Sequence, residues 1–84
     1  MEYVITFPNT NCAIVAERSL LSAGLPISVM PAPVSISRSC GISLRITEDS
    51  LQKALFILSD NNIDFSTIYT RIRKAGGFEY TQIN

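Results

Sequence analysis

The hydrophobic pattern along the chain changes several times, and each change predicts a new element. Two short runs of β-branched, aromatic and aliphatic residues end at prolines, as strands do. A period-two alternation predicts a third strand, and a later alternation that slips near Ser66 predicts a fourth strand with a bulge. Apolar positions at helical spacing predict two helices. The expected strands cover residues 3–7, 27–30, 42–46 and 63–72, and the expected helices cover residues 11–23 and 48–59.

Capping residues precede both expected helices. Asn9, Thr10 and Asn11 have side chains that accept hydrogen bonds from the first free amides of a helix. Thr47 offers a hydroxyl cap to the second helix, and the two acidic residues that follow it complement the positive end of the helix dipole. These residues mark where each helix is expected to begin.

The predicted order β-α-β-β-α-β favours an α+β fold, a ferredoxin-like sandwich. In that fold a four-stranded antiparallel sheet has the strand order 4-1-3-2, and two helices cover one face of it. A chain of 84 residues holds a single core, so residues 1–75 are expected to form one domain. Residues 76–84, which begin with two glycines, are expected to be a loosely held C-terminal tail.

The composition limits the chemistry. The chain has seven basic and seven acidic residues, two cysteines and no histidine. Without histidine there is no imidazole base and no imidazole metal ligand, and we expect no metal or other cofactor. Balanced charge argues against nucleic acid as the main partner, and the one basic cluster, Arg71, Arg73 and Lys74, is expected to be a solvated strand end. No apolar run has the length that spans a membrane, so a cytoplasmic protein is expected.

The two cysteines meet in the predicted topology. Cys12 falls in the first turn of the first helix and Cys40 in the loop between the second and third strands, at the same end of the sheet. A thiol beside a helix N-terminus has a pKa lowered to ~3.5–7.5, and Arg38 adds positive charge near Cys40. Gly41 allows a close approach of a partner or a positive φ angle. Because Ser39 supplies a hydroxyl but no base, the arrangement fits a carrier better than a hydrolase.

A known family shares this pattern. The loop Ser37-Arg38-Ser39-Cys40-Gly41, preceded by the opening run at residues 3–10 and followed by Ile42-Ser43-Leu44-Arg45, resembles the selenium/sulfur carrier-like family. The resemblance covers residues 3–72 and implies that Cys40 is the carrier thiol. Arg38 stands where the family loop has a serine, and Cys12 stands where the family has no fixed cysteine.

The sequence therefore predicts a non-enzymatic carrier that holds sulfur or selenium on Cys40 as a persulfide or perselenide. Its expected partners are a cysteine desulfurase or selenium donor and an acceptor enzyme. The residues expected to bind or activate around Cys40 are Arg38, Ser39, Gly41, Thr10 and Asn11, with Cys12 as a candidate second thiol.

Two alternatives stay open at this point. One is a regulatory or ligand-binding homodimer in which Cys40 is incidental, suggested by the neutral surface and by Phe56 and Ile57 outside the core stripe. The other is a redox switch that joins Cys12 to Cys40, which requires Cα atoms within about 7 Å of each other.

Overall fold

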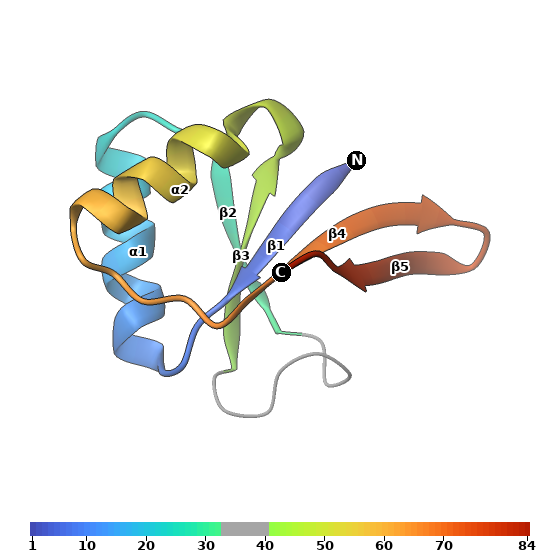
Figure 1. Ribbon diagram of the computed structural model, residues 1–84. Coiled ribbons are helices and arrows are strands. Elements are labelled where there is room, and N and C mark those ends of the chain that lie inside the picture. The colour runs from blue at the N-terminus through green and yellow to red at the C-terminus, as the bar shows by residue number, and fades with distance from the viewer. Residues whose placement is uncertain (33–40) are drawn as a thin grey trace.

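The computed structural model describes residues 1–32 and 41–84. Its strands form one antiparallel sheet in the order β2-β3-β1-β4-β5. Both helices lie on one face of this sheet, and β4 and β5 extend beyond them as a hairpin (Figure 1). In chain order the elements are β1 (Glu2–Thr6), α1 (Thr10–Ser22), β2 (Ile27–Pro31), β3 (Ile42–Thr47), the 3-10 turn η1 (Glu48–Ser50), α2 (Leu51–Asp60), β4 (Thr67–Lys74) and β5 (Gly77–Gln82).

The prediction of a ferredoxin-like, four-stranded sheet is wrong. The sheet has a fifth strand, β5, and the element order is β-α-β-β-α-β-β. Residues expected to form a loose tail instead pair with β4 from Tyr69–Gln82 to Lys74–Gly77. Gly76 in the connecting turn has a φ of +86°, a conformation that side chains with a Cβ rarely adopt. The expectation that β3 lies between β1 and β2 is confirmed.

The core lies between the helices and the face of the sheet that they cover. Ile5 of β1 stands opposite Leu44 of β3 and Ile68 of β4, and all three side chains are buried. Burial of one such aliphatic side chain contributes about 1.5–3 kcal/mol, so this row joins the three central strands to the helical layer. The helices bury small and branched residues against it: Ala13, Ala16 and Leu20 from α1, and Leu51, Ala54 and Leu58 from α2.

The strand β4 begins later than the hydrophobic alternation predicts. Ile63 closes α2, because its N–H donates to the carbonyl of Leu58 at 2.9 Å, while Asn62 takes a φ of 55°. The chain then reaches the sheet at Ser66, whose N–H donates to the Thr6 carbonyl at 2.8 Å. The slip in the alternation therefore marks the beginning of a strand, and the prediction of a bulge is wrong.

The start of the second helix also differs from its prediction. A 3-10 turn precedes α2, and Thr47 makes no side-chain hydrogen bond to the helix backbone. Its hydroxyl donates instead to the Ser50 hydroxyl, at 3.1 Å. The acidic residues Glu48 and Asp49 lie in this 3-10 turn.

Candidate functional site

One end of the sheet brings together the start of α1 and the ends of several strands (Figure 1). β1 finishes there at Thr6, which pairs with Ser43 of β3 and Thr67 of β4. β2 finishes there at Pro31, opposite Ile42. We refer to this region as the Cys12 end, and define it by Thr6, by residues 9–12, and by the flanking residues Pro31, Ala32, Gly41 and Ile42.

The first turn of α1 is held by Asn9. Its side-chain oxygen accepts a hydrogen bond from the backbone N–H of Cys12 at 2.9 Å, and its carbonyl accepts one from Ala13 at 3.3 Å. Thr10 and Asn11 are the first two helical residues and are exposed. Their own amides precede the first intrahelical acceptor, so they belong to the unpaired, positive end of the helix. Of the three predicted capping residues, Asn9 is the one whose side chain caps.

Cys12 lies on the side of α1 that faces the turn after α2. Its side chain is half-buried and packs against the core. It also borders a pocket of about 250 Å³. The other residues of this pocket are Asn11 and Val15 from α1, and Asn61, Asn62, Ile63 and Asp64 from the segment after α2.

The chemistry available at the Cys12 end is limited among the described residues. No hydrogen bond joins the Cys12 sulfur to any of them. Within residues 1–32 and 41–84, no three histidine, cysteine or acidic side chains are grouped so as to hold a metal ion. What this end offers is a thiol, free helix amides and small polar side chains, which suits binding to an anionic sulfur better than acid–base catalysis.

Gly41 is the described residue next to Cys40 in the sequence. Its carbonyl accepts a hydrogen bond from the Ala32 N–H at 3.1 Å, which adds one link beyond the Pro31–Ile42 pair. Gly41 is exposed, and a Cβ built on it meets no atom within 4 Å. Its φ is outside the left-handed region, so a positive φ does not explain the glycine. The open space that a close partner requires is present.

The structure brings together only some of the predicted site residues. Gly41, Thr10, Asn11 and Cys12 lie at the Cys12 end, as their positions in the elements show. Cys40, Arg38 and Ser39 lie outside the described residues. The distance between the two cysteines is therefore untested.

The sequence did not identify the polar residues that border Cys12 from the segment after α2. The pattern Asp60-Asn61-Asn62 after the second expected helix indicates an exit turn, and Asn61 does serve there, since its side-chain N–H donates to the Ile57 carbonyl at 2.8 Å. Asp64 carries no such signal. Two consecutive asparagines after an apolar stripe indicate a helix stop. Which part of α1 they face depends on how the two helices pack, and no local pattern carries that information.

Comparison with known proteins gives one finding. A family model described as "Putative Se/S carrier protein-like" matches residues 2–70. The matched range runs from β1 into β4, contains both cysteines and leaves out β5. The description denotes a carrier of selenium or sulfur, a role that involves donor and acceptor proteins in general. Comparisons with curated proteins and with solved structures find no match.

None of the helices in the described part of the chain is long and apolar enough to cross a membrane.

Proposed function

Because the chain belongs to the Se/S carrier protein-like family, we propose that it carries sulfur or selenium as a persulfide or perselenide on Cys40. The observation that supports this best is the position of Gly41, the neighbour of Cys40, at the same end of the sheet as the α1 N-terminus. A helix N-terminus carries roughly half a positive charge and stabilises nearby anions. A thiolate or persulfide near this end is stabilised by that charge.

The loading step needs no acid or base from the carrier. The Cys40 thiolate attacks the outer sulfur of a persulfide on the donor, a cysteine desulfurase. A new bond forms between that sulfur and Cys40, the sulfur–sulfur bond of the donor breaks, and the donor cysteine leaves as a thiolate. The proton on the outer sulfur stays on that sulfur and is transferred to Cys40 together with it. An acceptor thiolate removes the sulfur by the same exchange, so no oxidant or reductant is consumed.

The other residues of the Cys12 end have supporting roles in this proposal. Thr10 and Asn11 are exposed residues whose backbone N–H groups lack intrahelical acceptors, and in this proposal those groups bind the sulfur or a docked partner. Arg38 and Ser39 are proposed to contribute a positive charge and a hydroxyl beside Cys40. Gly41 leaves room for the backbone of the partner.

Sulfur loading tests the proposal directly. The protein is incubated with a cysteine desulfurase and cysteine, and its intact mass is measured without reductant. We expect a gain of one sulfur atom in the wild type and in Cys12→Ser, and none in Cys40→Ser. The two serine variants are matched, because each removes one thiol and leaves the other. A wild-type protein that gains no sulfur, or a Cys40→Ser variant that gains as much as the wild type, contradicts the carrier function.

Exposure of Phe56 keeps the homodimeric binding module as a second candidate. The side chain is 69% exposed on α2, outside the apolar stripe that packs into the core. Contiguous exposed apolar side chains mark association surfaces, and Phe56 is the most exposed large hydrophobic residue among the described residues. Sedimentation equilibrium of the wild type and of Phe56→Ser distinguishes the candidates: a dimer that Phe56→Ser dissociates, together with no sulfur loading, favours the binding module.

A further inference from the structure

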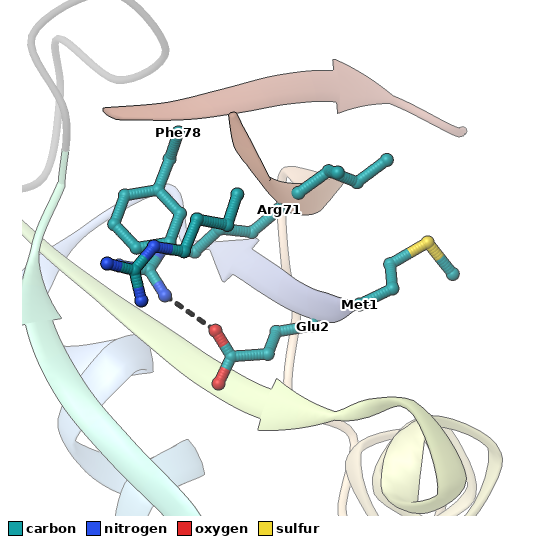
Figure 2. Close-up of a pocket in the computed structure, with 6 residues that line it drawn as sticks. Met1, Glu2, Arg71 and Phe78 are labelled. Carbon is teal, nitrogen blue, oxygen red and sulfur yellow. Dashed lines mark hydrogen bonds and ion pairs between the residues drawn. The ribbon is translucent and has the colours of Figure 1, made fainter. Parts of the chain in front are cut away.

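A second pocket lies at the end of β1 opposite the Cys12 end. It encloses about 460 Å³ beside the start of β1 and the hairpin of β4 and β5 (Figure 2). We refer to it as the Arg71 pocket. Its lining residues are Met1, Glu2, Arg71, Ile72, Arg73 and Phe78.

The strand register places the charged and aromatic members of this pocket on one face. Glu2 pairs with Arg71, and Arg73 pairs with Phe78 across the hairpin. Residues two apart on a strand share a face, so all four side chains lie on the same side of the sheet. Ile5, which packs under the helices, is three positions from Glu2 and belongs to the other side. The Arg71 pocket therefore opens on the face that the helices leave uncovered.

Arg71 is fixed in place by its neighbours. Its guanidinium donates a hydrogen bond to the Glu2 carboxylate and lies against the Phe78 ring (Figure 2), 3.5 Å from the ring centre. It donates a second hydrogen bond to the Tyr80 hydroxyl. Burial by itself lowers the pKa of Arg71, but the hydrogen bonds to Tyr80 and Glu2 outweigh it and raise the pKa above the usual value. The side chain is only 13% exposed, so the expectation of a solvated strand end is wrong for this residue.

Positive charge is in excess around the Arg71 pocket. Glu2 is shared by two arginines, since Arg45 also approaches it, with 3.5 Å between the Arg45 Nε and a Glu2 carboxylate oxygen. Arg73 is exposed and has no ion pair or hydrogen bond with any residue in the described ranges. At and beside the pocket, three guanidinium groups therefore share this face of the sheet with the one Glu2 carboxylate, although the whole chain has a net charge of zero. The unpaired group is Arg73.

The edge strand beside the pocket suits an extended polypeptide. β5 is the outer strand of the sheet on this side, and its residues are exposed except for the half-buried Tyr80. It contains no proline, and its one charged residue, Glu79, lies between Phe78 and Tyr80 and so belongs to the face away from the pocket. The other edge strand, β2, ends at Pro31 and follows Pro26. Proline and charge are the usual protection against pairing at a sheet edge. An extended segment can therefore align beside β5 with its side chains over the pocket.

We propose that the Arg71 pocket docks an acidic, extended segment of a partner protein, with a carboxylate side chain bound by Arg73 and an apolar side chain packed on Phe78. The pocket has the volume that a few side chains fill, and its charge complements a carboxylate. Arg71, Arg73 and Phe78 lie outside the residues 2–70 that match the family, so this site belongs to the hairpin of this chain. It gives the proposed carrier a docking surface that is separate from the thiol, because the five residues of β1 put about 13 Å between the two ends.

The test uses a hexaglutamate peptide and isotope-labelled full-length protein followed by NMR. We expect chemical-shift changes confined to the start of β1, the end of β4, and β5. Arg73→Gln should raise the Kd for the peptide about tenfold. Lys74→Gln is the matched control, because it removes the same charge from the next residue of β4, which points to the other face. Cys40→Ser should bind like the wild type, so the result is independent of the carrier function.

Each other outcome overturns the docking proposal. If Arg73→Gln and Lys74→Gln lose the same affinity for hexaglutamate, the binding is general charge attraction. If inorganic phosphate changes the chemical shifts of these residues and the peptide does not, the pocket binds a free small anion. Self-association in sedimentation equilibrium that Arg73→Gln abolishes assigns the surface to a second copy of the chain.

Discussion

The two ends of β1 differ in the groups that they present, which are mainly backbone groups at one end and side chains at the other. At the Cys12 end, the useful groups come mainly from the backbone: the first amides of α1, the space above Gly41, and the single hydrogen bond between Ala32 and Gly41. At the Arg71 pocket, side chains from β1, β4 and β5 hold one another in place. In the proposed function the first region gives room and partial positive charge to the carried sulfur or selenium, and in the docking proposal the second gives a fixed shape to the bound segment. Under these two proposals, the domain carries sulfur or selenium at one end of β1 and docks its partner at the other.

The largest expected effect tests that separation. We predict that Cys40→Ser abolishes sulfur loading and leaves the affinity for hexaglutamate unchanged, while Arg73→Gln weakens that affinity about tenfold and leaves loading by free desulfurase intact. Intact-mass spectrometry and NMR titration measure the two properties on the same samples. If either variant impairs both properties, the two ends are coupled and the comparison fails.

The next effect concerns the rigidity of the Arg71 pocket. Arg71→Met removes the hydrogen bonds to Glu2 and Tyr80 and the charge over Phe78, and we predict a loss of about 2 kcal/mol in the free energy of unfolding. Arg73→Met is the control, with an expected change below about 0.5 kcal/mol because Arg73 is exposed. Urea unfolding measures both. Similar losses in the two variants would show that Arg71 is not the organising residue.

A smaller effect is expected at the Cys12 end. Asn9→Ala removes the side chain that accepts the Cys12 N–H, and loss of such a cap costs about 1 kcal/mol. Asn11→Ala alters an exposed residue of the same turn and should change the unfolding midpoint very little. Hydrogen exchange at the Cys12 amide gives a local readout, and should accelerate in Asn9→Ala alone. Equal protection in both variants would mean that Asn9 does not hold this turn.

The smallest expected effect on stability is at Gly41. The φ of Gly41 is not positive and a Cβ there has open space. Gly41→Ala should therefore raise the free energy of unfolding by about 0.5 kcal/mol, because alanine reduces the conformational entropy of the unfolded chain. In the proposed function the same methyl group meets the partner, so transfer to an acceptor should become slower. Thermal unfolding and a transfer assay measure the two results. Marked destabilisation would show that the fold itself needs this glycine.

The elements with a buried face were predictable from the sequence. Alternation at Ile42, Leu44 and Ile46 gave β3, and the helical spacing of Leu51, Ala54 and Leu58 gave most of α2, because those side chains enter the core. β5 has no such face. Its residues are exposed except for the half-buried Tyr80, so the periodic signal is missing, although the glycine pair before Phe78 was a usable sign of a hairpin turn.

The candidate sites were predictable only in part, for a related reason. The convergence of α1 with the ends of β1 and β3 followed from the order of the elements, so the position of Cys12 at that end was within reach of the sequence. The Arg71 pocket depended on β5, and on the register that pairs Glu2 with Arg71. A basic cluster near the end of a strand looks solvated until the neighbouring strand is known.

The central position of β1 in the sheet has a consequence for how the chain folds. β1 precedes the other described strands in the chain and lies between β3 and β4, and the bond from Arg71 to Glu2 spans 69 residues. Contacts between residues so distant in sequence slow folding, because the intervening chain must be ordered before they form. During synthesis β1 cannot complete its second set of backbone hydrogen bonds until β4 has left the ribosome, so β1 waits with one edge unpaired while the helices and the two following strands are made.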